Sequence, residues 1–118
     1  MARSLILVLG VALILAGLFV LLRPNSPAEG PQTREFDLRI SDEVMEPSNV
    51  TVTEGDRVVL RISTDSPLEV HVHGYDIEQE LEPDEPARLS FEADLTGRFE
   101  IEDHETEEEL GTLVVEPR

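Results

Sequence analysis

The 118-residue sequence contains no cysteine. Its absence excludes disulfide bonds, thiolate metal ligands and lipid attachment at a cysteine side chain. Small domains outside the cytoplasm often gain stability from a disulfide, so a domain built by this chain must rely on its hydrophobic core. We therefore expect modest stability and, for any metal site, ligands other than thiolates.

Lysine is absent as well, and all nine basic residues are arginine. All 26 acidic residues follow residue 28, where only seven arginines stand, so this part carries 7 − 26 = −19 charges. Nucleic acid and anionic lipid are poor partners for such a surface. Repulsion among the carboxylates also destabilises the fold, an effect that salt relieves. A salt-rich habitat is one hypothesis for this composition, and an acidic surface that maintains solubility is the other.

Common catalytic signatures are also missing from the sequence. Neither Gly-x-Ser-x-Gly nor His-Glu-x-x-His occurs, which removes two frequent patterns of hydrolases. Pairs of carboxylates occur throughout so acidic a chain and therefore do not indicate a glycosidase-like site. We predict that the protein is not an enzyme.

One long apolar run stands at the N-terminus. Residues 5–22 include no charged or strongly polar side chain, and as a helix they would rise about 27 Å, close to the hydrocarbon thickness of a bilayer. We assign residues 1–23 to a signal-anchor or transmembrane segment. Arg3 should lie on the cytoplasmic side, and the residues from 24 onward should lie in the periplasm or at the cell surface. The alternative is a signal peptide cleaved after the small residues of 26–28, which would make the protein secreted.

Two further parts of the sequence follow the apolar run, a proline-rich segment and a segment of alternating apolar and polar residues. Residues 24–33 are rich in proline and are predicted to be a linker. From residue 34 to residue 118 apolar side chains alternate with polar ones, a pattern typical of strands, and turn residues separate the runs. No stretch here shows a helical period, so we predict an all-β sandwich or barrel in one domain, with a mixed α+β domain as the alternative. The expected strands are 36–40, 50–52, 58–62, 68–72, 89–91, 99–101 and 113–115, and 83–86 is expected to be a loop.

The order of these segments resembles the cupredoxin-like domains, which are Greek-key β-sandwiches that often hold copper. The resemblance covers about residues 34–117. It rests on five segments in this order: Pro47 with Val50–Val52 and Glu54–Val58, Glu69–Tyr75, Leu81–Pro86, Phe91–Phe99, and Gly111–Val115. The resemblance implies a Greek-key cupredoxin-like β-sandwich preceded by one N-terminal transmembrane or signal helix.

The blue-copper ligands of this family are matched only in part. His73 stands at the position of the first histidine, whereas Asp103 occupies the position of the cysteine and Glu109 that of the methionine. The second histidine has no clear match, because His104 lies directly beside the cysteine position. A blue-copper electron-transfer site requires a thiolate, so we do not expect a blue-copper electron carrier.

The histidines nevertheless suggest a metal site. His71 and His73 are two residues apart in an expected strand, so they project from the same face with Cα atoms about 7 Å apart. The sequence does not decide whether that face is the core. The resemblance implies that the loop with His104 returns to this place, so His71, His73 and His104 with Asp103 or Glu109 could hold copper or zinc. The alternative is that these histidines are ordinary polar side chains without a metal.

The segment 100–109 holds seven acidic residues in ten positions. It could attract a hard cation such as Ca²⁺, but the spacing of a calcium-binding loop does not occur. A solvated acidic loop is the preferred interpretation.

These observations together predict a membrane-anchored, extracytoplasmic cupredoxin-like binding module. We expect it to interact with the membrane through the N-terminal helix and to bind a divalent metal such as copper through histidines, without nucleic acid as a partner. The alternative is a metal-free structural or protein-interaction β-sandwich that has lost the metal site. The sequence names no protein partner.

Overall fold

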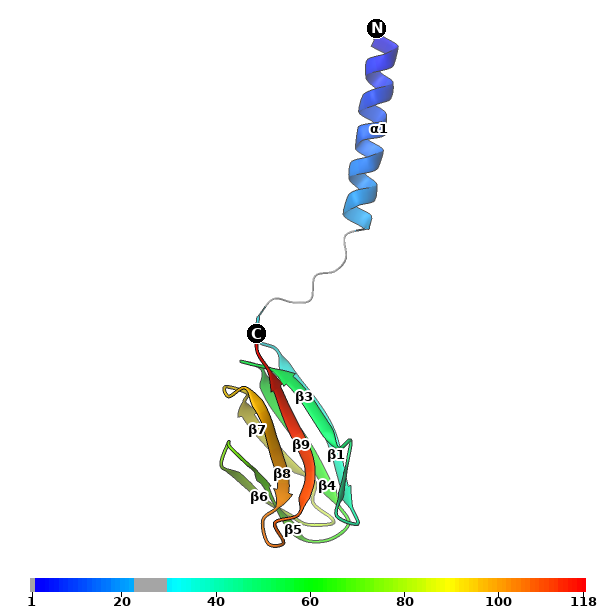
Figure 1. The fold of residues 1–118 in the computed structure, drawn as a ribbon. Coiled ribbons are helices and arrows are strands. Elements are labelled where there is room, and N and C mark those ends of the chain that lie inside the picture. The colour runs from blue at the N-terminus through cyan, green and yellow to red at the C-terminus, as the bar shows by residue number, and fades with distance from the viewer. Residues whose placement is uncertain (1, 23–29) are drawn as a thin grey trace.

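The computed structural model describes residues 2–22 and 30–118. Within them one helix precedes nine strands (Figure 1). The elements are α1 (Ala2–Leu21), β1 (Thr33–Ser41), β2 (Val44–Glu46), β3 (Asn49–Thr53), β4 (Arg57–Thr64), β5 (Leu68–Val72), β6 (Ile77–Leu81), β7 (Ala87–Glu92), β8 (Gly97–Asp103) and β9 (Glu109–Glu116).

Helix α1 is apolar on all sides, and its side chains are exposed from Arg3 onward. The stretch Arg3–Leu21 is long and apolar enough to cross a membrane. A helix that is hydrophobic all round is typical of a buried core helix or of a membrane span, and among the described residues none of this stretch is buried. The expected cleavage positions, 26–28, and most of the expected linker lie outside the described residues.

The strands form two sheets that pack face to face (Figure 1). One sheet has the order β2-β1-β4-β7 and the other the order β3-β9-β8-β5-β6. Both are mixed, because β1 pairs parallel to β4 and β3 pairs parallel to β9. Alternating apolar side chains from both sheets, among them Leu60, Val72 and Leu113, fill the space between them. The prediction of an all-β Greek-key cupredoxin-like sandwich is confirmed.

Two strands differ from the prediction because the sequence gives them almost no alternation of buried residues. Strands β2 and β6 both lie at the edge of a sheet. Each strand has only one buried residue, Met45 in β2 and Leu81 in β6. A period of two cannot be recognised from a single buried residue. The first strand also begins at Thr33, one residue inside the expected linker.

The interpretation of 100–109 as a solvated loop is wrong for its first four residues. They belong to β8, which runs to Asp103. Phe99 and Ile101 pack against the core, and Glu100 between them is exposed. Glu102 and Asp103 are buried, and the turn consists of residues 104–108, since β9 begins at Glu109.

A buried carboxylate joins the two chain ends of the sandwich. Asp56 is only 1% exposed and accepts hydrogen bonds from the backbone N–H groups of Gln32 at 2.9 Å and Thr53 at 3.1 Å. Arg118 donates to the same carboxylate at 2.6 Å and to the carbonyl of Gly30 at 2.9 Å. The C-terminus therefore lies beside the place where the chain enters the domain (Figure 1).

Salt should stabilise this domain, because seven arginines cannot neutralise its acidic residues. Raising NaCl from about 0.01 M to about 1 M shortens the screening length from about 30 Å to about 3 Å. We expect the unfolding midpoint to rise by about 5 °C or more, which corresponds to about 1 kcal/mol for a domain of this size. Circular dichroism of the full chain in detergent measures this change. A midpoint that does not respond to salt would contradict both the expectation and the hypothesis of a salt-rich habitat.

Candidate metal centre

The structure decides which face of β5 carries the histidines. Val70 and Val72 are both 0% exposed and belong to the core, so His71 between them projects from the outer face of the five-stranded sheet. His73 follows directly after the strand, and its backbone N–H still donates to the carbonyl of Glu100 at 2.9 Å. This bond continues the alignment of β5 beside β8 and keeps both imidazoles on one side.

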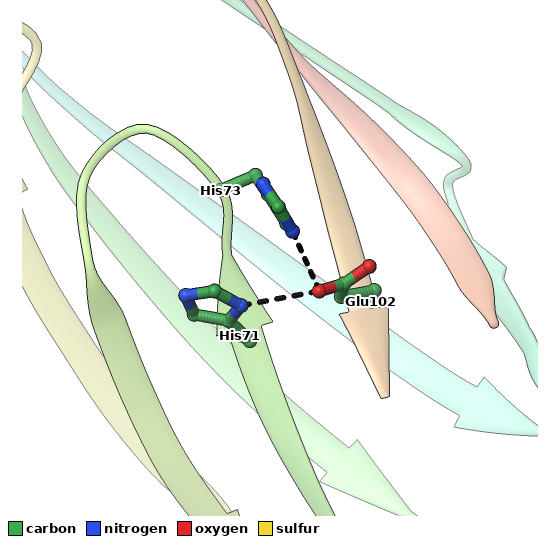
Figure 2. Close-up of side chains that lie close together, drawn as sticks. All are labelled: His71, His73 and Glu102. Carbon is green, nitrogen blue, oxygen red and sulfur yellow. Dashed lines mark hydrogen bonds and ion pairs between the residues drawn. The ribbon is translucent and has the colours of Figure 1, made fainter. Parts of the chain in front are cut away.

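A carboxylate from the neighbouring strand meets both imidazoles. Glu102 lies directly opposite His71 in the pairing of β5 with β8. One of its oxygens, Oε1, lies 3.2 Å from Nδ1 of His71 and 2.7 Å from Nε2 of His73 (Figure 2). The ligand atoms of the three residues all lie within 4.8 Å of one another. Two imidazole nitrogens and one carboxylate oxygen form a ligand set that suits Cu(II) and Zn(II).

The charge state of Glu102 favours a cation. The hydrogen bond with His71 lowers the pKa of the Glu102 carboxyl, and the neighbouring His73 lowers it further, which outweighs the opposing effect of burial. The carboxylate is therefore ionised at neutral pH. Its side chain is 11% exposed and that of His71 is 16% exposed, whereas His73 is 54% exposed. The group is thus closed on the side of the sheet and open to solvent beside His73.

His104 lies near this group without joining it. Its ring stands edge-on to the ring of His71, with the centroids 5.6 Å apart. Its Nδ1 atom lies 3.7 Å from Oε1 of Glu78, and its ligand atoms gather with those of Glu69 and Glu78 instead. The three histidines are therefore neighbours, but they are divided between two groups of possible ligands.

Asp103 and Glu109, the two carboxylates expected as further ligands, belong to neither group. Oδ1 of Asp103 accepts a hydrogen bond from the backbone N–H of Glu105 at 3.0 Å, which stabilises the turn after β8. Oε1 of Glu109 accepts one from the hydroxyl of Thr112 at 3.1 Å. In this structure both carboxylates are engaged within their own hairpin.

Glu102 is the residue that sequence reasoning missed. Within the acidic run its residue type does not distinguish it from the other glutamates. The distinguishing property is the register of β8 against β5, which places Glu102 opposite His71. The alternation of Phe99 and Ile101 with outward residues was the one signal that could have placed Glu102 on the outer face of a strand.

Solved structures of copper proteins share this fold. The metal-binding domain of the Cu(I)-exporting P-type ATPase CopA from Streptococcus pneumoniae has a TM-score of 0.63 at 14% identity, covering 76% of this chain and 98% of that one. A chain of a haem–copper terminal oxidase dimer has a TM-score of 0.60 at 15% identity, covering 98% of this chain and 100% of that one. The blue copper oxidase from Nitrosomonas europaea has a TM-score of 0.58 at 22% identity, covering 73% of this chain but only 39% of that one.

A comparison with curated protein sequences finds no significant match. The model of the cupredoxin-like domain family matches residues 11–115. That range includes the whole sandwich up to the last buried residue of β9. Together with the absence of cysteine and the two-sheet architecture, this match shows that the chain belongs to the cupredoxin-like domain family and is a member without the cysteine ligand of blue-copper sites.

Proposed function

We propose that this protein binds a divalent metal ion, Cu(II) in preference to others, through His71, His73 and Glu102. The observation that carries the proposal is the convergence of two imidazole nitrogens on one ionised carboxylate oxygen. Nitrogen and oxygen ligands favour Cu(II) and Zn(II), with Cu(II) bound more tightly, whereas Cu(I) favours thiolate or thioether sulfur. Met45 is fully buried in the core, so its sulfur is no ligand for this surface.

The proposed role is to hold the metal and exchange it, without electron transfer or catalysis. Three protein ligands leave coordination positions open, and the exposed side of His73 gives another molecule access to them. A blue-copper site requires a cysteine thiolate as a ligand, and this chain has no cysteine. The similarity to the blue copper oxidase covers 39% of that enzyme's chain, and the described residues offer no cysteine for such chemistry.

The proposed location is the outer side of a membrane, with α1 retained as an anchor. The length and composition of Arg3–Leu21 support this. Glu102 stands near the end of β8 that is far from the pairing of Gly97 with Val115, and hence far from the C-terminus and Gly30 (Figure 1). The metal group would thus lie in the half of the domain away from the anchor.

Replacing His73 by alanine tests this function. Removing one of three ligands should weaken Cu(II) binding at the tightest site about 100-fold. The measurement is a calorimetric titration of the full chain in detergent with Cu(II) and, separately, Zn(II). Thr51→Ala is the matched control, because Thr51 lies on the same outer face and is in neither ligand group, and this variant should bind as the wild type does.

A different result would favour the metal-free alternative. Glu102 already contacts both histidines, and the described residues contain no buried polar side-chain atom without a hydrogen-bond partner. Absence of binding, or binding that His73→Ala leaves unchanged, would mean that these contacts serve the stability of the sheet. The function would then lie in an interaction with another protein.

A further inference from the structure

We propose a second divalent-cation site beside the first, formed by Glu69, Glu78 and His104, so that this face holds a pair of ions on either side of the His71 ring. The inference rests on the proposed function and extends it. The ligand atoms of these three residues lie within 4.8 Å of one another, and the group offers one imidazole and two carboxylates.

His71 lies between the two groups because of the strand order. β5 runs between β6 and β8, and His71 lies directly opposite Glu78 on one side and Glu102 on the other. Its Nδ1 atom faces Glu102, and its other ring nitrogen points away from that carboxylate (Figure 2). The edge-on contact of the His71 and His104 rings brings the second group close enough for the two ions to influence each other.

The backbone holds the three residues of the second group near one another. The N–H of His104 donates to the carbonyl of Glu69 at 2.8 Å, which ties the turn after β8 to the beginning of β5. Nδ1 of His104 lies 3.7 Å from Glu78 on β6. The pairing of β5 with β6 and this bond to the turn thus bring together ligands from three separate parts of the chain.

The negative charges of the glutamates on the outer face of β5 and β6 lack a positive partner from arginine among the described residues. Glu69 lies directly opposite Glu80 in the pairing of β5 with β6, and like charges in this position destabilise a sheet. Among residues 2–22 and 30–118, neither of these glutamates nor Glu78 forms an ion pair with an arginine. The outer face of the other sheet differs, because Arg61 and Arg88 both pair with Glu35 there.

The surroundings of the second group select the kind of ion. A hollow of about 190 Å³ shares Glu69 with the group and is lined by four glutamates, among them Glu80 and Glu105, and by the apolar residues Pro67, Leu68 and Leu81. With two carboxylates and one imidazole, the group is harder than the first one, which has two imidazoles and one carboxylate. Zn(II) accepts both sets of ligands, whereas Cu(II) is favoured where imidazoles dominate. Zn(II) is therefore the ion that should fill both sites.

Counting bound zinc in matched variants tests the pair. The full chain in detergent is dialysed against Zn(II), and the metal content per chain is measured by mass spectrometry. We expect two ions for the wild type, one for Glu78→Gln, one for His73→Ala and none for the double variant. The tighter dissociation constant should change less than threefold in Glu78→Gln, and Glu92→Gln, which removes a carboxylate from β7 in the other sheet, should keep two ions.

The possible failures are distinguishable. If the wild type binds one ion and Glu78→Gln binds it equally well, the second site is overturned while the proposed function stands. If the single ion is lost in Glu78→Gln but kept in His73→Ala, the second group is the metal site and the proposed function fails. If neither the wild type nor any variant binds zinc, the second site is overturned, while the proposed function stands or falls with the separate Cu(II) titration of the wild type and His73→Ala.

Discussion

Replacing Gly111 by alanine is expected to destabilise the sandwich by about 3–4 kcal/mol, a cost typical of severe overpacking in a filled core. A Cβ atom at Gly111 would lie 2.2 Å from the terminal methyl of Met45 and 2.6 Å from the backbone oxygen of Ser48. The methionine side chain is completely buried and has little space to move. The Ser48 oxygen accepts the hydrogen bond of Thr112 at 2.8 Å, so its displacement would also disturb the ladder.

Thermal unfolding of the full chain in detergent, followed by circular dichroism, measures this effect. Thr112→Ala is the matched control, because the side chain is partly exposed on the outer face and loses only its bond to Glu109. It should cost about 1 kcal/mol or less. Equal midpoints for Gly111→Ala and the control would show that β2 and β9 can move apart without loss, contrary to the packing described above.

Replacing Asp56 by asparagine is expected to cost about 3 kcal/mol, since it removes a buried charge whose partners remain. The two oxygens of Asp56 accept bonds from the N–H groups of Gln32 and Thr53 and from Arg118. An asparagine amide offers only one oxygen as an acceptor. Its NH2 group, which carries two N–H donors, would face another N–H donor where the second carboxylate oxygen now accepts a hydrogen bond. Arg118→Ala is the control that removes only the partly exposed arginine, and we expect it to cost about 1 kcal/mol.

The acid dependence of stability separates this role of Asp56 from simple packing. Burial alone would raise the pKa of the Asp56 carboxyl, but the hydrogen bonds from Gln32 and Thr53 and the charges of Arg118 and Arg34 outweigh burial and lower the pKa. The stabilisation is therefore complete above the ordinary carboxyl pKa of about 3.9 and is lost as the pH falls through the lower folded pKa. The difference in stability between wild type and Asp56→Asn should shrink in that acidic range. A constant difference from pH 7 to pH 2 would show that the charge of Asp56 contributes nothing.

The candidate metal centre is not a blue-copper site with one ligand exchanged. Asp103 occupies the position that the family resemblance assigns to the cysteine, yet its carboxylate is bonded to the N–H of Glu105 within the turn. The residue that meets His73 is Glu102, one position earlier and on the outer side of the sheet. The candidate ligand group lies on the outer face of β5 and β8, away from the turn that holds Asp103.

The outward position has a chemical consequence for the metal. A ligand set on an open sheet face imposes little geometry, so a bound Cu(II) ion can complete its coordination with water or with a group from another molecule. Glu69, Glu78 and Glu80 surround the site with negative charge that no arginine of residues 2–22 and 30–118 neutralises. This field attracts cations and repels anionic partners. A basic or metal-carrying surface is the complement that we expect such a face to meet.

How much of the fold the sequence predicts depends on how many residues each element buries. The apolar run of 5–22 and the alternation in β1, β4 and β5 are local properties, because a helix in a bilayer and a half-buried strand each impose their own period on the chain. The strands β2 and β6 escape prediction because their pairing, and not their own composition, makes them strands. The sequence also places Val70 and Val72 on one face of β5 and His71 on the other without deciding which face is the core.

For the candidate metal site too, some features follow from the sequence and others only from the tertiary structure. The sequence by itself determines that no metal ligand is a thiolate, that His71 and His73 share a face of their strand, and that the cysteine ligand of a blue-copper site is missing, because these conclusions depend only on residue type and spacing. Only the tertiary structure decides that Glu102 completes the group and that His104 joins Glu69 and Glu78. Those partners are brought together by the register between β5, β6 and β8, and register depends on which side chains the two sheets bury together, a property that no single strand contains.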